Sequence, residues 1–222
     1  MYESEQKSSI NKKPNLFAKI LLEVVDLVSF FIMALWVVFF IRLFIFSPFT
    51  VVGQSMEPAL HERDFLIIDK VSGLQNKLYT TSWTSNAITR ALPDIKRWDI
   101  IVFIPPQEIE DGKHLVKRII WLPWETVKLE WGKVYICNTN KECNLLDEPY
   151  LAKDKETLSD RGISSFKIEN GYFVMWDNRD HSTDSRSCFM GVGCYEGYSY
   201  VVPYQNVIGR VRLRLSPNYN KF

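Results

Sequence analysis

Apolar residues are concentrated in one long run near the start of the chain and are spread in short runs beyond it. Residues 27–41 contain no charged side chain, and after Arg42 the apolar character continues to Phe46. The segment 27–46 is twenty residues long, enough for one helix to cross a hydrocarbon layer about 30 Å thick. Arg42 lies near the end of this segment, where its long side chain can reach the interface. The pattern predicts one transmembrane helix over 27–46.

Two other interpretations of the apolar segment are weaker. A cleavable signal peptide has a shorter apolar region followed by a small-x-small cleavage site, and no such site follows residue 46. A buried core helix is uncommon for so long and aromatic-rich a run in a chain of this size.

Charge predicts the orientation of this helix. Lys7, Lys12, Lys13 and Lys19 precede it, and basic residues favour the cytoplasmic side of a membrane. We therefore expect residues 1–26 in the cytoplasm and an extracytoplasmic domain formed by residues 47–222.

The whole-chain charge and the histidines argue against two classes of partner. The 27 basic and 26 acidic residues give a net charge of +1, which provides no electrostatic basis for binding nucleic acid. The histidines at positions 61, 114 and 181 match no metal-ligand spacing. We expect no metal and no cofactor.

Beyond residue 47 the apolar runs have the length and composition of β-strands. They are rich in β-branched and aromatic residues and are bounded by turn formers. The predicted strands are 65–69, 99–104, 126–130, 133–136, 172–175 and 207–215. No strand–helix–strand alternation is evident, so the pattern predicts a mostly β domain with an antiparallel sheet core.

The last predicted strand has two different faces. Val211, Leu213 and Leu215 alternate with Arg210, Arg212 and Arg214, which predicts one buried face and one basic face. The basic face is either solvated or in contact with lipid headgroups, and a solvated face is the commoner case.

Two polar stretches, 72–97 and 137–170, have no clear period and predict insertions, the second forming a small cap. The cysteines form two C-x5-C pairs, Cys137 with Cys143 and Cys188 with Cys194. Four cysteines allow three connectivities, of which two local disulfides are the simplest. A four-cysteine zinc site is the alternative, although its usual ligand spacing is shorter.

Three segments carry side chains suited to catalysis. Ser55 lies in VVGQSMEPAL, Lys117 lies among apolar neighbours in HLVKRII, and DNRDHSTDSR directly follows the apolar strand near residue 175. Taken singly, each has an ordinary explanation: a turn serine, a lysine reaching solvent, and a surface loop held by exposed ion pairs.

Taken together and in this order, the segments resemble the boxes of type I signal peptidases. GQSMEPAL resembles G-x-S-M-x-P-T-L, KRIIWLPWE resembles K-R-x-x-G-L-P-G-D, and WDNRDHSTDSR resembles G-D-N-R-x-x-S-x-D-S-R. A fourth segment, KRWDIIVF at 96–103, resembles K-R-G-D-x-V-x-F. The resemblance spans roughly residues 30–213 and is weakest through 72–97 and 138–170.

The resemblance implies a signal-peptidase-like antiparallel β-sheet catalytic domain and a serine endopeptidase. In the implied mechanism Ser55 is the nucleophile and a neutral Lys117 is the general base. A free lysine has a pKa near 10.4, and burial among apolar groups lowers it. The implied enzyme is a monomer in the bacterial plasma membrane that removes signal peptides from exported preproteins.

Further roles follow from the same resemblance. Ser182 would orient the Lys117 amine, and ion pairs of Asp177, Arg179, Asp184 and Arg186 would hold the loop behind the dyad. The Ser55 N–H would be one oxyanion donor, and the second stays open because Gly53 stands where some members carry a serine. Met56 and the apolar segment 48–52 would line the substrate groove near the membrane surface. The substrate would bind as an added β-strand, with small residues at positions −1 and −3 of an Ala-x-Ala site.

The boxes also contain unusual departures. Trp98, Trp121, Trp124 and Trp176 stand where the family carries glycine, and Trp131 is a possible fifth case. One hypothesis is that these codons are UGA, which some bacteria read as glycine. The departures, with those at Ala59 and Glu125, also motivate the alternative of a membrane-tethered homologue that binds peptides without cleaving them. Related self-cleaving repressors and pilin-type processing enzymes are a further alternative, although no DNA-binding region is evident.

Overall fold

The computed structural model describes most of the chain in two compact units, which divide after Leu43. The described residues are 15–79, 94–106, 113–122, 124–152, 155–159, 162–180, 183–189 and 199–217.

The first unit contains a single long helix, α1, over Leu16–Phe44. It begins well before residue 27, because Lys19, Glu23 and Asp26 are compatible with a helix although they interrupt the apolar run. No residue of α1 is buried, and its apolar side chains point in all directions. This arrangement fits a transmembrane helix and contradicts the alternative of a buried core helix.

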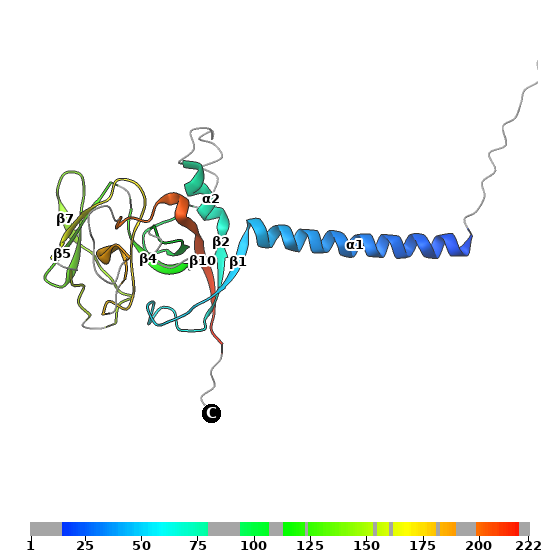
Figure 1. Ribbon diagram of the computed structural model, residues 1–222, viewed down its shortest axis with the longest axis horizontal. Coiled ribbons are helices and arrows are strands. Elements are labelled where there is room, and N and C mark those ends of the chain that lie inside the picture. Colours follow the sequence, from blue (N-terminus) through cyan, green and yellow to red (C-terminus); the bar gives the residue numbers. More distant parts are fainter. Residues whose placement is uncertain are drawn as a thin grey trace, which may run out of the picture. The chain divides into compact units, whose positions relative to one another are not determined.

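The second unit is built on a six-stranded sheet in which every neighbouring pair is antiparallel. Its order is β1-β2-β10-β3-β4-β9, with β1 and β9 at the edges. Figure 1 labels four of these strands, β1, β2, β10 and β4. The strands are β1 Phe46–Thr50, β2 Phe65–Asp69, β3 Ile100–Phe103, β4 Leu115–Trp121, β9 Phe173–Met175 and β10 Val207–Leu215.

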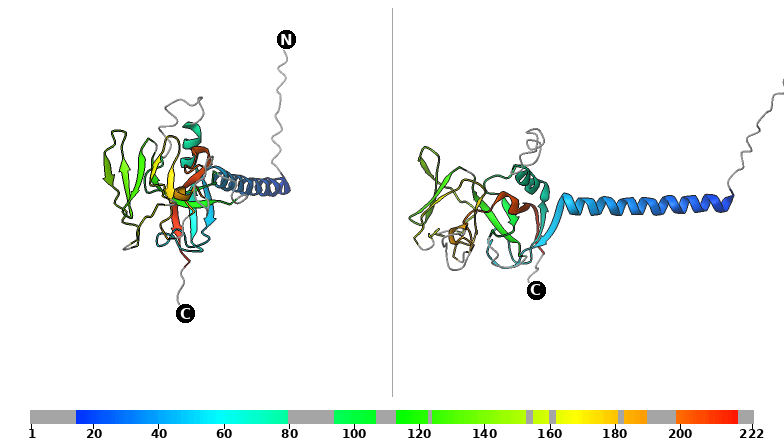
Figure 2. Two further views of the ribbon diagram at one scale, coloured as in Figure 1. Left: turned by 60° about the vertical axis from the view of Figure 1, so that its left-hand side comes forward. Right: turned by 45° about the horizontal axis from the view of Figure 1, so that its top comes forward.

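A second, four-stranded antiparallel sheet has the order β7-β6-β5-β8. Its strands are β5 Thr126–Glu130, β6 Lys133–Cys137, β7 Cys143–Leu145 and β8 Ser165–Lys167. Both views in Figure 2 show it at the end of the unit opposite to β1. The described part of the unit also contains three short helices, α2 Lys70–Tyr79, η1 Ser185–Ser187 and η2 Tyr204–Asn206. The predicted mostly β, antiparallel fold is confirmed.

In their described parts, the two predicted insertions contain regular structure that their polar sequences did not predict. Segment 137–170 supplies β7 and β8 to the second sheet, and its Phe166 and Ile168 are buried in the core with Val127 and Phe173. Segment 72–97 begins inside α2. Residues 80–93 lie outside the described part of the chain.

Strand β10 differs from its prediction. Leu213 and Leu215 are about half exposed, at 51% and 49%, so the strand has no continuous buried face. A register shift between Val211 and Leu213 against β2 disrupts the alternation on which the prediction depended.

The arginines of β10 are engaged by acidic residues of the same sheet region. Arg210 pairs with Asp99 at 2.9 Å, Arg212 with Asp69 at 3.0 Å, and Arg214 with Asp64 at 2.6 Å. These ion pairs explain the basic residues without lipid contact.

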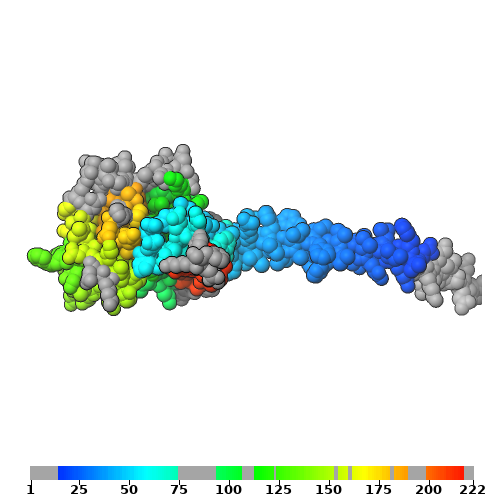
Figure 3. Space-filling view, turned by 90° about the horizontal axis from the view of Figure 1, so that it is seen from below, coloured from blue at the N-terminus to red at the C-terminus, as the bar shows by residue number. Residues whose placement is uncertain are grey.

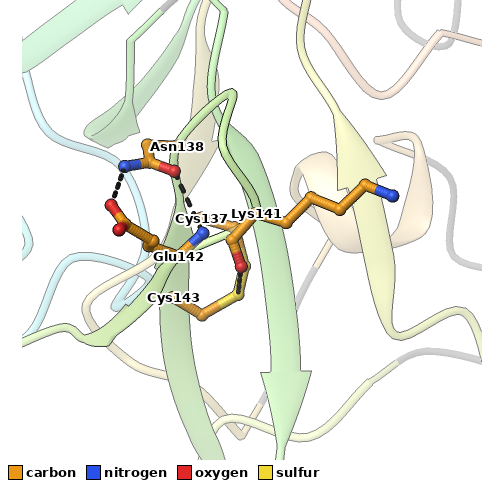
Figure 4. The surroundings of a disulfide bond; sticks show 5 residues. All are labelled: Cys137, Asn138, Lys141, Glu142 and Cys143. Carbon is orange, nitrogen blue, oxygen red and sulfur yellow. Dashed lines mark hydrogen bonds between the residues drawn. A yellow bond between two sulfur atoms is a disulfide. The ribbon is translucent and has the colours of Figure 1, made fainter.

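The first predicted disulfide is present. Cys137 and Cys143 are bonded across the β6–β7 turn, where Asn138 accepts a hydrogen bond from the Glu142 amide and donates one to its carboxylate (Figure 4). Cys188 is also disulfide-bonded and fully buried. The second predicted pair stays a prediction, because Cys194 lies outside the described residues.

Candidate active site

Ser55 lies in the loop that connects β1 to β2. Backbone hydrogen bonds between Val51 and Asp64, and between Arg63 and Val51, close the two ends of this loop at 2.9 Å each. Met56 and Leu60 are buried beneath it, at 1% and 2% exposure. The loop is therefore anchored on both sides of Ser55, which itself stays half-buried.

Gly53 enables the tight path of this loop. Its φ of +86° lies in the left-handed region that glycine adopts without strain, and a Cβ added there would meet no atom within 4 Å. The position therefore has room for a side chain but an unfavourable backbone for one.

Lys117 lies in the middle of β4 and is paired with Ile101 of β3. It is only 2% exposed, and its Nζ donates a hydrogen bond of 2.9 Å to the Val116 carbonyl. Burial lowers the pKa of Lys117 from 10.5 to about 7, and the charges of Asp184 and Asp177 oppose this shift in part. The amine can therefore be neutral near physiological pH, as a general base requires.

The loop and the strand bring Ser55 and Lys117 to the same cavity, of about 340 Å³. Gly53 and Met56 line it as well, and Met56 is one of the residues that the resemblance assigns to a substrate groove. Trp176 and Thr183 also line this cavity. In Figure 3 the surface of the loop near residue 60, in cyan, borders that of the segment near residue 185, in orange.

The segment after β9 is fastened to the Ser55 loop and to β4. The Asn178 N–H donates to the Ser55 carbonyl at 3.0 Å. Asp177 accepts two hydrogen bonds from Arg118, from Nε at 2.8 Å and from Nη2 at 2.6 Å, and both residues are buried. A paired, bidentate arrangement of this kind fixes geometry as well as charge.

Asp184 organises the rest of this segment. It caps η1 by accepting the Arg186 amide at 2.9 Å, pairs with the Arg186 guanidinium at 3.0 Å, and accepts the Trp176 amide at 3.3 Å. Ser185 Oγ accepts the Val174 N–H of β9 at 3.0 Å. The alternative of an exposed loop held by weak ion pairs is wrong, because Asp177, Arg179, Asp184 and Arg186 are all at most 4% exposed.

Arg179 pairs outside its own segment, with residues that the sequence did not single out. Its Nη2 contacts the Glu148 carboxylate at 2.5 Å and the Tyr150 hydroxyl at 3.0 Å, and its Nη1 donates to Thr157 Oγ1 at 2.5 Å. The Arg118 guanidinium lies 4.2 Å from the Tyr150 ring centroid. The sequence did contain a signal for Arg118, which directly follows Lys117 in the KRIIWLPWE box. It contained none for Glu148 and Tyr150, which lie in no segment that resembles the family boxes.

Trp176 lies directly over the candidate base. Its ring centroid is 4.3 Å from Lys117 Nζ. Ser182, the predicted partner of this amine, lies outside the described residues, and its role stays a prediction. Within the described part of the chain, no cluster of three His, Cys, Asp or Glu side chains could hold a metal ion.

Comparison with known proteins adds an independent line of information. Residues 24–216 match the family model described as signal peptidase, peptidase S26. Signal peptidase I from Bacillus amyloliquefaciens is 34% identical over 179 residues, which cover 78% of this chain and 80% of that protein. Signal peptidase I S from Bacillus subtilis (strain 168) is 35% identical over 163 residues, covering 70% and 72%.

A structural comparison gives a partial match. A crystal structure of a signal peptidase I from Enterococcus faecalis V583 is 28% identical and aligns with a TM-score of 0.39, covering 54% of this chain and 98% of that chain. The family follows from the sequence matches, which extend over most of the chain and both of the segments that carry Ser55 and Lys117. This chain belongs to the signal peptidase family, peptidase S26.

Proposed function

We propose that the chain is a membrane-bound serine endopeptidase that removes N-terminal signal peptides from exported preproteins. Family membership supports the reaction, and one observation supports its mechanism: a buried Lys117 with a pKa of about 7 shares a cavity with Ser55. The domain from residue 47 onward acts on the outer side of the bacterial plasma membrane.

In the first half of the reaction the Ser55 hydroxyl attacks the scissile carbonyl and transfers its proton to the neutral Lys117 amine. The resulting oxyanion accepts a hydrogen bond from the Ser55 N–H. The ammonium then gives the proton to the departing amine, and an acyl-enzyme remains on Ser55. Ser182 orients the amine through a hydrogen bond.

In the second half a water molecule loses a proton to Lys117 and attacks the acyl-enzyme. The tetrahedral intermediate collapses, the proton returns to Ser55, and the cleaved signal peptide leaves. Small residues at positions −1 and −3 fit a groove formed by Gly53, Met56 and segment 48–52. The preprotein binds there as an extended strand.

The test is cleavage of a preprotein with an Ala-x-Ala site by the full chain in detergent. Ser55→Ala and Lys117→Ala should each lower kcat/KM at least ~10³-fold while the near-ultraviolet circular dichroism stays that of the parent. Lys128→Ala, which replaces a half-buried lysine of β5, is the matched control and should cleave normally. Retention of most activity by either Ser55→Ala or Lys117→Ala would contradict the dyad.

A further inference from the structure

Three tryptophans of this chain occupy backbone conformations that belong to glycine. Trp98 has a φ of +74°, Trp124 of +73° and Trp131 of +53°. The left-handed region is reached by only a few per cent of non-glycine residues, among which Asn, Asp and His are enriched, and it is least suited to bulky ones. Among the described residues seven non-glycines lie there, and three of them are tryptophans.

Local turns explain the angles of Trp98 and Trp131, and the sequence indicates a turn at Trp124. Trp98 is the third residue of the turn Lys96–Asp99, which is closed by the Asp99 N–H donating to the Lys96 carbonyl at 3.2 Å. Because Arg97, the second residue, is not among those with positive φ, the positive φ of Trp98 makes this a type II turn, for which glycine is the usual third residue. Trp124 follows Pro123 in sequence, and Pro-Gly is the pair that type II turns favour.

Trp131 stands in the hairpin between β5 and β6. Glu130 pairs with Lys133, so Trp131 and Gly132 form a two-residue loop, and both have positive φ. This is a type I′ turn, which favours Asn-Gly or Gly-Gly. The Trp131 side chain is 91% exposed and has no packing that would offset its backbone.

Trp176 conflicts with the site rather than with the backbone. Its ring covers Lys117 Nζ, the atom that the proposed mechanism requires to face Ser55, and it lines the cavity that both residues share. Its indole N–H is buried and finds no acceptor among the described residues. The ring also favours the ammonium form of the lysine, which is the inactive form of a base.

We propose that positions 98, 124 and 131 are glycine positions of this fold, and that the functional chain carries glycine there and at position 176, because its UGA codons are read as glycine. The composition points the same way: 10 glycines in 222 residues compare with about 16 expected from average usage. Trp121 is not among the described residues with positive φ and is packed in the core. Its buried indole N–H, like that of Trp176, finds no acceptor within the described chain.

The direct test is peptide mass spectrometry of the protein purified from the organism that encodes it. Peptides that span the four positions should contain glycine, and the gene should carry UGA at each. Tryptophan-containing peptides, or UGG codons at these positions, would overturn the proposal. The same experiment identifies the residue at position 121. Glycine there would extend the recoding to a position whose backbone conformation does not itself require glycine.

A second test uses the full recombinant chain in detergent and needs no activity. Trp131→Gly should raise the thermal midpoint by about 2–4 °C, because the left-handed backbone is relieved at an exposed site. Trp131→Asn should recover part of this gain, since Asn tolerates the conformation, and Trp131→Val should recover none. Lys133→Gly, an exposed strand position, is the matched control and should lower the midpoint. Equal midpoints for Trp131→Gly and Trp131→Val would contradict a backbone origin.

The consequence at position 176 rests on the proposed function and is measured separately. Trp176→Gly should raise kcat/KM for an Ala-x-Ala preprotein at least tenfold at neutral pH, and Trp131→Gly should leave it unchanged. If the native peptides contain glycine and neither chain cleaves, the proposed function fails and the glycine assignment stands. If they contain tryptophan and the parent chain cleaves, the assignment fails and the function stands.

Discussion

The most informative residue of the site is Lys117, because a charged amine is costly to bury. It lies in the middle of a central strand with 2% exposure, and its Nζ has one carbonyl acceptor among the described residues. The two nearby carboxylates form ion pairs with other residues, Asp184 with Arg186 and Asp177 with Arg118. They therefore offset only part of the desolvation that lowers the pKa of the lysine.

The rate of cleavage should follow the ionisation of this amine. With a pKa of about 7, the neutral fraction of Lys117 rises tenfold per pH unit below neutrality and levels off above it. We expect kcat/KM to rise in the same way when initial rates are measured from about pH 5 to about pH 9. A profile that stays flat over this range would argue against a lysine base.

The same pKa makes stability depend on pH. The unfolded chain holds the Lys117 proton up to about pH 10.5 and the folded chain only up to about 7, so unfolding takes up a proton in this window and stability rises with pH across it. Lys117→Met removes the free-energy cost of burying a charged amine. This cost lowers the stability of the parent by about 5 kcal/mol below pH 7 and is absent above pH 10.5.

Urea unfolding at several pH values checks this prediction. Lys117→Met should be more stable than the parent at pH 6 and lose that advantage as the pH approaches 10.5. Lys128→Met, at a half-buried position of β5, should change stability by less than about 0.5 kcal/mol. An advantage of Lys117→Met that is the same at every pH would indicate better packing rather than removal of a buried charge.

At the scale of elements, the segment that joins two strands of the second sheet contacts the residues that follow β9. The segment between β7 and β8 carries Glu148, Tyr150 and Thr157, all of which contact the buried Arg179 guanidinium. Arg179 also donates to the Trp176 carbonyl at 2.7 Å, at the end of β9. The polar segment predicted as a cap is thus part of the framework that positions the segment after β9.

Removing one partner of this buried pair should be costly. Glu148→Gln leaves the Arg179 guanidinium without its carboxylate, at a side-chain exposure of 0%, and should lower stability by about 3 kcal/mol. Asp180→Asn breaks the more exposed pair with Lys155 and should cost less than about 1 kcal/mol. Both values follow from urea unfolding at neutral pH, and equal losses for the two variants would show that Arg179 does not depend on Glu148.

At the scale of the whole molecule, the chain combines an apolar helix with a β unit whose site opens to solvent. Because α1 buries none of its own residues, its exposed apolar side chains fit a helix that spans a membrane. The four lysines before residue 20 predict a cytoplasmic N-terminus.

Reporter fusions test this orientation. Alkaline phosphatase joined after Phe222 should be active, because it folds only outside the cytoplasm, and β-galactosidase joined at the same point should be inactive. Replacing the four lysines by glutamine should reduce this asymmetry. The opposite pattern of reporter activity would place the β unit in the cytoplasm and exclude its access to exported preproteins.

The sequence alone determined the elements whose signal is local. The strands at 65–69, 126–130 and 207–215 have the predicted bounds, and the apolar helix is where the longest uncharged run lies. The three boxes indicated the family before any geometry was known. Composition and period carry this information because they depend on neighbouring residues only.

Tertiary structure decided which elements meet. Strand β1 was hidden in the apolar run that follows the helix, and β7 and β8 were hidden in a polar segment. The pairing of Asp177 with Arg118, and of Arg179 with Glu148, joins residues 59 and 31 positions apart. The exposure of Leu213 depends on a register shift against β2. Such contacts arise from strand order and register, which bring residues together that are distant in sequence. A contact of this kind produces no periodic pattern of apolar and polar residues, so the sequence alone does not predict it.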